Sequence, residues 1–230
     1  MDSLRSFLKT HPSAMDAAAF LYTLVFSPNV FFHRRIHSRG AFIRRCRFDL
    51  SGPDVSICVG RMARVTGCRF SIQGANGSIQ IGGGNTIVSH STFCAHDDGS
   101  AIRIGRDFTM EGGEIAATEG EEIIVGDDCM FSYDIDIRNG DSHVVLDRET
   151  GRRTNRARTI SIGRHVWLAG HAVVLKGSVI PDDCIIGNRS SVIGKLPSSH
   201  SIYAGIPARL VRGGVTWDRF RLHYQHDGDE

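Results

Sequence analysis

Aliphatic side chains recur at every sixth position through the C-terminal part of the chain. The series runs through Ile162, Leu168, Val174, Ile180, Ile186 and Val192, and it continues at Ser198, Ala204 and Leu210. A small or modest residue stands four positions after each of the first five, at Val166, Ala172, Ser178, Cys184 and Ser190. A helix would require spacings of three and four, and an ordinary strand a spacing of two. The hexad pattern therefore predicts triangular coils, in which each face is a short strand and the aliphatic side chain points inward.

The first half of the chain repeats on a longer period. An aliphatic residue followed by glycine occurs at Val59-Gly60, Ile81-Gly82, Ile104-Gly105 and Val125-Gly126, at intervals of 22, 23 and 21 residues. Three hexads account for 18 of these, so each coil carries three to five additional residues at one corner. The corner sequences "GANGS", "HDDGS" and "TEGEE" combine glycine with polar residues, as turns require. The next pair, Ile162-Gly163, follows after 37 residues, which predicts two coils and one ejected loop.

These repeats predict an all-β fold, a left-handed parallel β-helix over residues 51–211, in which neighbouring coils bury one another's faces. A loop is expected to protrude at 144–159, and residues 212–230 form a C-terminal tail. Residues 1–50 lack the hexad and are predicted to cap the open end, with a helix over 14–32. The apolar run 17–32 is short for a membrane span and is interrupted by Pro28-Asn29. Association of this segment and its nearby arginines with a membrane surface is the less favoured alternative.

The composition limits the possible binding partners and the cellular location of the protein. The chain has 230 residues, 41% of them hydrophobic, and its formal net charge of +2 does not indicate nucleic-acid binding. Of the 27 basic residues, only Lys9, Lys176 and Lys195 are lysines. The arginine excess suits phosphate or carboxylate partners, and codon usage in a GC-rich genome is the alternative explanation. Six cysteines without CxxC spacing, and no recognisable signal peptide, favour a reducing, cytoplasmic location.

Two stretches carry a resemblance to a known family. The segment "VWLAGHAVVLKGSVIPDDCIIGNRSSVIG", followed by "IYAGIPARLVR", resembles the bacterial hexapeptide-repeat acyltransferases. The segment "IRNGDSHVVLDRETGRRTN", followed by "HVWLAG", resembles the O-acetyltransferases of capsule and exopolysaccharide gene clusters, in particular those that act on sialic-acid capsules. The resemblance implies acetyl-CoA as the acyl donor and a sugar hydroxyl of a polysaccharide as the acceptor. It also implies a homotrimer with sites between subunits.

The resemblance implies that His143 is catalytic. A base must remove the proton from the acceptor hydroxyl, and histidine suits this role because its unperturbed pKa of about 6.5 lies near working pH. His143 occupies the hexad position after Val125, Phe131 and Ile137, so we expect the chain to leave the regular coil there. A histidine that merely ends a strand is the alternative. Asp141 is expected either to orient the imidazole ring or to cap the turn.

The donor side of the site is expected on the coils beyond residue 162. The family has an essential tryptophan at the last position of "HVW", which matches Trp167, whose ring is suited to pack against pantetheine or sugar. Burial of Trp167 at a subunit contact is a compatible alternative. Residues expected to line the coenzyme A slot are Ala169, Gly170, Lys176, Gly187 and, in the terminal motif "GIPAR", Arg209. The small residues would permit close approach and expose backbone N–H groups, while the basic ones would lie near phosphates.

The ejected loop is rich in arginine and borders the proposed cleft. Residues 147–158 contain five arginines against Asp147 and Glu149. A solvated charged face is the simple explanation, and contact with an anionic sugar is the functional one. Residues expected to contact the acceptor are Arg138, Arg152, Arg153 and Asn155, the last because it matches the family's "RxN" element.

Two other functions and a second acceptor remain open on the sequence. Zinc carbonic anhydrases share this fold, and His143, His165 and His171 would be the ligands, since Zn²⁺ accepts three histidines. The spacing of six between His165 and His171 departs from the pair five apart that such enzymes need, so no metal is expected. A non-enzymatic solenoid scaffold would leave the histidine, the tryptophan and "GIPAR" unexplained. Among enzymes, a free sugar or sugar nucleotide is the alternative acceptor.

Overall fold

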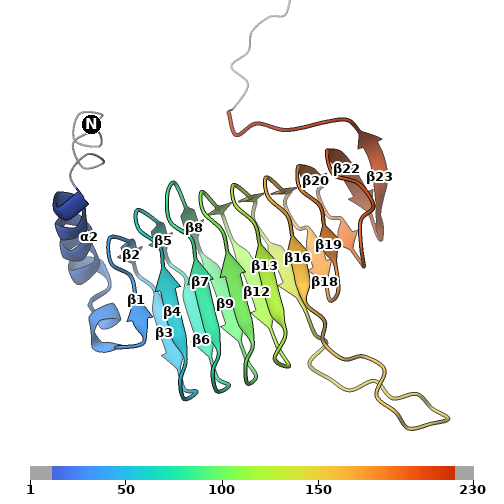
Figure 1. The fold of residues 1–230 in the computed structure, drawn as a ribbon, viewed down its shortest axis with the longest axis horizontal. Helices are drawn as coiled ribbons and strands as arrows, with labels where there is room; N and C mark the ends of the chain where they lie inside the picture. The colour runs from blue at the N-terminus through green and yellow to red at the C-terminus, as the bar shows by residue number, and fades with distance from the viewer. Residues whose placement is uncertain (1–11, 221–230) are drawn as a thin grey trace, which may run out of the picture.

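The computed structural model describes residues 12–220, which form a three-sided parallel solenoid with one sheet on each side (Figure 1). The first sheet contains β1 (Ile36–His37), β4 (Ser56–Val59), β7 (Ser78–Ile81), β10 (Ala101–Ile104), β13 (Glu122–Val125), β16 (Ile160–Ile162) and β19 (Val179–Ile180). The second contains β2 (Phe42–Arg44), β5 (Arg64–Thr66), β8 (Ile87–Ser89), β11 (Thr109–Met110), β14 (Met130–Phe131), β17 (Trp167–Leu168), β20 (Cys184–Ile186), β22 (Ser201–Gly205) and β23 (Ala208–Gly213). The third contains β3 (Arg47–Leu50), β6 (Arg69–Ile72), β9 (Ser91–Ala95), β12 (Gly113–Ala117), β15 (Ile135–Arg138), β18 (Val173–Leu175) and β21 (Ser191–Val192). Each coil thus passes through the three sheets in turn, which confirms the predicted parallel β-helix.

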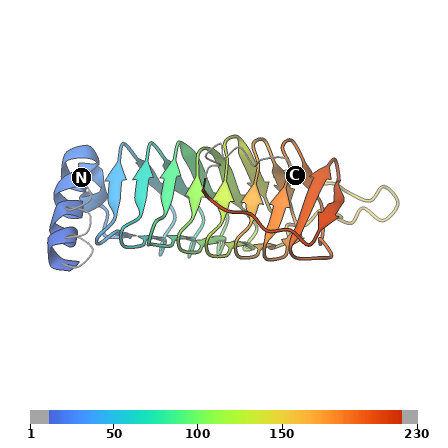
Figure 2. The same cartoon turned by 90° about the horizontal axis from the view of Figure 1, so that it is seen from above.

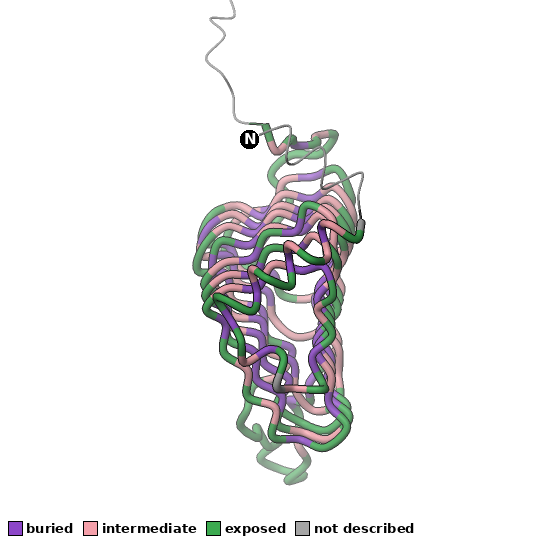
Figure 3. Tube along the Cα trace, turned by 90° about the vertical axis from the view of Figure 1, so that its left-hand side faces the viewer, coloured by how far each residue is buried: buried purple, intermediate pink, exposed green. Residues whose placement is uncertain are grey.

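The core is a set of stacked columns of inward side chains. In the first sheet the parallel register aligns one buried column, made of Ile57, Ile79, Ile102, Ile123 and Ile160. In the third sheet the rings of Phe48, Phe70 and Phe93 stack at centroid distances of 5.2 Å. Figure 3 shows buried positions alternating with exposed ones along the coils. A parallel solenoid needs this alignment, because each coil can bury its inward side chains only against its neighbours.

The solenoid begins earlier than the sequence predicted. Strands β1, β2 and β3 form a complete first coil between residues 36 and 50, and each pairs with the next strand of its own sheet. The boundary at residue 51 was therefore wrong. The inward side chains of this coil, Ile36 and Ile43, stand seven positions apart, so the hexad pattern did not reveal them.

The solenoid also ends differently. After Val192 the hexad no longer marks the interior, since Tyr203 is buried and Leu210 is exposed. Strand β22 pairs parallel with β20 on one side and antiparallel with β23 on the other, so a hairpin closes this end. The Ile206-Pro207 peptide bond within the hairpin is cis.

Helix α2 (Pro12–Phe26) and the 3-10 helix η1 (Pro28–Phe32) cover the other end, with α2 lying across the first coil (Figure 2). The predicted single helix over 14–32 is interrupted because Pro28 has no N–H to continue the α-helical ladder. Thr23 attaches α2 to the coil: its hydroxyl donates to the carbonyl of Ala41 at 3.1 Å and accepts from the N–H of Ile43 at 3.2 Å. Within residues 12–220, no helix combines the length and apolar character needed to cross a membrane.

Candidate active site

Residues 140–158 leave the solenoid as an extended hairpin, here called the arm (Figure 1). The two sides of the arm are joined by an antiparallel bridge between Leu146 and Arg153. Backbone hydrogen bonds from Asp147 to Arg152 (2.8 Å) and from Thr154 to Val145 (2.9 Å) continue this pairing. The arm starts after β15, at the corner between the third and first sheets. The ejected loop that the sequence predicted over 144–159 corresponds to this arm, which starts a few residues earlier.

The chain leaves the coil at Asn139, four residues before His143. Asn139 is fully buried, and its side-chain oxygen accepts the N–H of Thr118 at 2.9 Å. His143 is exposed and lies within the arm. The expectation that His143 itself occupies an inward hexad position was therefore wrong, because Asn139 already ends the coil.

Asn155 holds the base of the arm around His143. This side chain is only 8% exposed. Its Nδ2 donates to the carboxylate of Asp141 at 2.8 Å and to the carbonyl oxygen of His143 at 2.7 Å. Its Oδ1 accepts the N–H of Val145 at 2.8 Å. One buried amide thus fixes the backbone on both sides of His143, while the imidazole remains exposed.

Asp141 also lies where the arm leaves the solenoid. Its carboxylate forms an ion pair with Lys176 and accepts the amide of Asn155, while its backbone carbonyl accepts the N–H of His143 at 2.7 Å. The hydrogen bond from Lys176, followed by that from Asn155, lowers the pKa of Asp141 below its ordinary value. The structure therefore favours the turn-fixing role of Asp141 over a direct contact with the imidazole ring. Lys176, which was expected near a phosphate, forms this ion pair with Asp141 where the arm leaves the solenoid.

A second ion pair lies at the same place, where the arm leaves the solenoid. Arg153 reaches back to Glu119 on the preceding coil at 2.5 Å, and its Nε donates to Asn155 Oδ1 at 3.3 Å. The hydrogen bond from Arg153 lowers the pKa of Glu119. We call the side chains of Asp141, Asn155, Lys176, Arg153 and Glu119 the arm root. Arg153 thus belongs to the arm root, whereas Arg152 lies exposed near the tip of the arm.

Arg138 has a separate setting on the outer surface of the third sheet. Its guanidinium forms ion pairs with Asp136 at 2.6 Å and with Glu114 at 3.8 Å. These carboxylates raise the pKa of Arg138. Arg138 and Arg152 are thus not brought together with Arg153 into a single cluster, and their contacts with an acceptor stay predictions.

Trp167 opens β17 in the second sheet with its side chain directed outward, since the following residue, Leu168, is fully buried. It stacks in register between Met130 of β14 and Ile185 of β20. His143 lies in the connection from the third sheet to the first. In a three-sided coil that corner lies opposite the second sheet. Within one chain, His143 and Trp167 are therefore on opposite sides of the solenoid.

The residue beside Trp167 is one that the sequence did not indicate. Residues 214–220, here called the strap, fold back from β23 over the second sheet (Figure 2). Trp217 of the strap is 8% exposed, and its ring lies 6.1 Å from that of Trp167 and 4.1 Å from that of His165, parallel to the latter within 8°. Its Nε1 donates to the carbonyl oxygen of His165 at 2.9 Å. An isolated tryptophan in a tail outside the hexads carries no pattern that would have revealed this contact.

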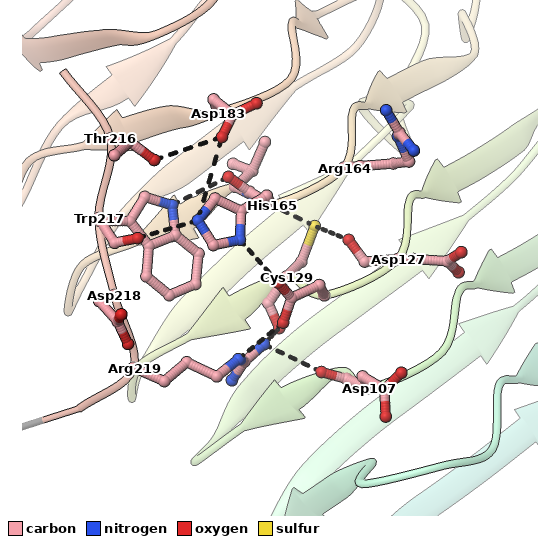
Figure 4. Close-up of polar contacts among 12 residues, drawn as sticks. Asp107, Asp127, Cys129, Arg164, His165, Asp183, Thr216, Trp217, Asp218 and Arg219 are labelled. Atoms are coloured by element: carbon pink, nitrogen blue, oxygen red, sulfur yellow. Dashed lines mark hydrogen bonds and ion pairs between the residues drawn. The ribbon is translucent and has the colours of Figure 1, made fainter.

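Arg219 fastens the end of the strap (Figure 4). Its guanidinium donates to Asp128 and to the hydroxyl of Thr109 at 2.8 Å, and to the backbone carbonyls of Asp107 and Cys129 at 2.9 Å. His165 also contacts Asp128, through Nδ1 at 2.7 Å. Burial opposes ionisation of Asp128, yet the hydrogen bonds from Arg219 and His165 leave its pKa lowered. The remainder of the predicted tail, residues 221–230, lies outside the described residues.

The small residues of the expected coenzyme A slot are used mainly for packing between coils. The N–H of Ala169 donates to Ile186 at 2.9 Å, and that of Gly187 donates to Tyr203 at 2.8 Å. The expectation that these two residues expose free N–H donors was wrong, because each coil pairs its backbone with the next one. A Cβ on Gly170 would approach the ring of Tyr133 to 3.1 Å, so glycine is favoured there by packing. Arg209 is exposed on β23.

The histidines considered as zinc ligands have other partners. His165 is held by Asp128 and the strap, while His171 packs edge-on against Tyr133 at 5.0 Å and lies 3.5 Å from Asp134. Among residues 12–220, no group of three or more His, Cys, Asp or Glu side chains is placed to hold a metal ion.

Comparison with known proteins finds related sequences and related structures. No protein-family profile matches the chain. It is 28% identical over 130 residues to a polysialic acid O-acetyltransferase of Neisseria meningitidis, covering 56% of this chain and 60% of that protein. It is 31% identical over 121 residues to the polysialic acid O-acetyltransferase of Escherichia coli O1:K1, covering 53% of this chain and 39% of that protein. The chain resembles the polysialic acid O-acetyltransferases. Each match spans less than two thirds of the relative's length.

The same likeness extends to the fold. The crystallographic structure of the polysialic acid O-acetyltransferase OatWY superposes with a TM-score of 0.68 at 23% identity, covering 84% of this chain and 95% of that one. The solenoid is accordingly a left-handed β-helix, as the hexad pattern predicted.

Proposed function

We propose that the protein transfers an acetyl group from acetyl-CoA to a sugar hydroxyl of a sialic-acid-type capsular polysaccharide. The observation that carries the proposal is the likeness to two polysialic acid O-acetyltransferases, in a chain whose His143 is exposed on a fixed arm root. The solenoid supplies a rigid frame, and the arm supplies the one exposed histidine that the sequence resemblance marks as catalytic. The alternative acceptor is a free sugar or sugar nucleotide.

In the proposed reaction, His143 acts as general base. The imidazole removes the proton of the acceptor hydroxyl while the hydroxyl oxygen attacks the carbonyl carbon of the thioester. The tetrahedral intermediate collapses with cleavage of the carbon–sulfur bond. The imidazolium then returns its proton to the departing thiolate, which leaves His143 neutral for the next cycle. Asn155 acts as a positioning residue, since it holds the backbone of His143 and has no part in the proton transfer.

We further propose that the active unit is a homotrimer with each site formed between two copies. This proposal is supported by the placement of His143 and Trp167 on opposite sides of one solenoid. Copies related by a threefold axis parallel to the solenoid would bring the arm of one chain toward the second sheet of its neighbour. Trp167 would then form an apolar wall beside the thioester carried to His143 of the adjacent copy.

Acetyl transfer can be tested directly with the purified full-length chain. Polysialic acid, other bacterial polysaccharides, free sialic acid and a sialic acid nucleotide would be offered with labelled acetyl-CoA. We expect transfer to the sialic acid polymer and retention of the label as an ester that mild base removes. Preferred transfer to the monomer or nucleotide would establish the alternative acceptor. Binding of acetyl-CoA measured by calorimetry separates an enzyme with another acceptor from a scaffold, which would bind none.

A mixed-subunit experiment tests whether the site is shared. His143→Ala and Trp167→Ala variants with different affinity tags would be co-expressed, and assemblies containing both would be isolated. If sites lie between copies, a mixed trimer contains one interface with both native side chains and regains about a third of its sites. If each chain carried a whole site, mixed assemblies would remain as inactive as the single variants.

A further inference from the structure

The outward face of α2 is apolar and exposed. The helix buries Met15, Ala19 and Thr23 against the first coil, four positions apart. Its opposite face exposes large apolar side chains, and the ring of Phe31 from η1 lies 4.9 Å from that of Phe20 and extends this surface. We call the set the end patch; its members and exposed fractions are Phe20 (51%), Leu21 (60%), Leu24 (43%), Val25 (70%) and Phe31 (42%). A helix that is apolar on both sides normally has a partner on each side.

The charge around the end patch is predominantly positive. From residue 17 to residue 48 the chain contains no Asp or Glu, and it contains six arginines. Arg34, Arg45 and Arg47 are exposed, and Arg44 lies over the ring of Phe26 at 5.0 Å, so positive charge lies next to the apolar surface. The occupant of this surface is therefore expected to be anionic as well as apolar.

A cavity beside the end patch combines the same two properties. It lies between α2 and the first coil and has a volume of about 450 Å³. The aromatic and basic side chains that line it include Phe20, Phe31, His33, Arg34, His37 and Arg39. Asp16, which also lines it, is already paired with Arg39 at 3.1 Å and Arg61 at 2.8 Å. The cavity thus offers an apolar wall for an acyl chain next to basic groups for an anionic headgroup.

Charge and chemistry select among the possible occupants. Two copies meeting end to end would bring like-charged arginines together, which disfavours self-association. A soluble anionic sugar polymer matches the arginines but gains little from five exposed aliphatic and aromatic side chains. An anionic lipid surface matches both, because interfacial helices place apolar side chains among acyl chains and basic side chains at the headgroups.

We propose that the end patch docks the solenoid, end on, to the surface of a membrane that contains anionic lipids. Leu21, Leu24, Val25 and Phe20 enter the headgroup–acyl boundary, and Arg34 and Arg45 interact with lipid phosphates. Thr23 and the buried face of α2 hold the helix on the first coil, so docking orients the whole solenoid away from the membrane. This assignment goes beyond acetyl transfer and does not depend on it.

Vesicle flotation with the full-length protein tests the apolar part of the proposal. The wild-type chain is expected to float with vesicles of phosphatidylcholine and phosphatidylglycerol, and much less with phosphatidylcholine alone. The double variant Leu21→Glu/Val25→Glu should lower the partition coefficient about tenfold or more, since both side chains would leave the acyl boundary. Ile193→Glu is the matched control, because Ile193 is 55% exposed far along the solenoid, and it should bind as the wild type does.

A charge variant and an insertion probe keep the test independent of helix folding. Arg34→Gln/Arg45→Gln should weaken binding to anionic vesicles by about fivefold per arginine and flatten its salt dependence, whereas Arg189→Gln should change neither. Phe20→Trp should add a fluorescence component that shifts to shorter wavelength on anionic vesicles. These two variants leave the exposed apolar residues Leu21 and Val25 in place.

Several results would overturn the proposal. They are absence of vesicle binding by the wild type, equal binding to neutral and anionic vesicles, or unchanged binding of both double variants. A change in oligomeric state in Leu21→Glu/Val25→Glu with no vesicle binding by the wild type would assign the end patch to a second copy. Arginine-dependent binding of soluble polysialic acid without vesicle binding would assign the arginines to a polysaccharide.

Discussion

The arm root and the strap both attach a non-repeating segment to the solenoid, but they do so by different interactions. The arm root uses one buried amide, Asn155, flanked by the ion pairs Asp141–Lys176 and Arg153–Glu119. The strap uses the stacked ring of Trp217 and one guanidinium, Arg219, with four acceptors. A polar root fixes the position of a backbone, whereas an aromatic contact contributes mainly buried area. The arm root is therefore suited to position His143, and the strap to stabilise the side of the solenoid that carries Trp167.

The largest expected effect comes from the side chain that the arm root presents. His143→Ala should lower turnover by roughly 10²–10⁴-fold, as expected for loss of a general base. The affinity for acetyl-CoA, measured by calorimetry, should be nearly unchanged, because in the proposed reaction the imidazole acts on the acceptor hydroxyl and not on the nucleotide. Wild-type turnover in a correctly assembled His143→Ala protein would contradict the assignment.

Asn155 tests whether the arm root positions His143. Asn155→Ala leaves the N–H of Val145 and the carbonyl of His143 without their buried partner, which should loosen the backbone and lower kcat about tenfold or more. The acetyl-CoA affinity and the melting temperature should change little, since the arm contributes few core contacts. Thr150→Ala, at the exposed tip of the arm, is the control. A fall in melting temperature with an unchanged kcat would show that Asn155 is only structural.

A substitution at Trp217 tests whether the strap stabilises the face of the solenoid that carries Trp167. Trp217→Ala removes a side chain that is 8% exposed, and it should lower the free energy of unfolding by about 3 kcal/mol. Because Trp217 lies beside Trp167, kcat/KM should fall by a few fold, less than in His143→Ala. Hydrogen exchange should increase in the strap and at β17. A protein with unchanged stability and exchange would show that the strap does not stabilise this face.

The two adjacent arginines of the arm should separate in their effects. Arg153→Glu places a negative charge beside Glu119 and should lower kcat several fold by disrupting the arm root. Arg152→Glu, in the exposed part of the arm, should instead raise the KM for an anionic acceptor by a few fold and weaken its salt dependence. The kinetics would be measured at two ionic strengths. Identical effects of the two substitutions would contradict this division.

The smallest expected effect is a pH dependence of the arm root. The pKa of Asp141 is lowered in the folded state, chiefly by Lys176. A carboxylate with a lowered pKa stabilises the fold above its unfolded pKa, and this contribution is lost as the pH falls through the lowered value. The side-chain amide signals of Asn155, followed by NMR, should therefore stay unchanged down to acidic pH and then shift. In Asp141→Asn that acid transition should be absent.

The sequence alone determined the coil and the place where it is interrupted. Aliphatic side chains at every sixth position can all point to one interior only if each side of a three-sided coil takes six residues. The β-helix therefore followed from the spacing. The interval of 37 residues located the ejected loop, but the prediction of two coils within it was wrong: β13 pairs directly with β16, so one coil and the arm account for the whole interval. The hexad pattern does not predict the N-terminal coil, because its inward residues Ile36 and Ile43 are seven positions apart. The cap was recognised as helical from its apolar run, although Pro28 divides it.

The tertiary structure alone decided which polar and aromatic side chains meet. Asp141 and Lys176 are 35 residues apart, Arg153 and Glu119 are 34 apart, and Trp217 and His165 are 52 apart. Stacking of the coils, the folding of the arm against the preceding coil, and the return of the strap along the second sheet together bring these residues into contact. The hexad specifies what points inward but says nothing about partners on the outer surface. For that reason the sequence did not indicate Trp217, and it indicated Asn155 only as a contact for the acceptor and not as the residue that holds the backbone on both sides of His143.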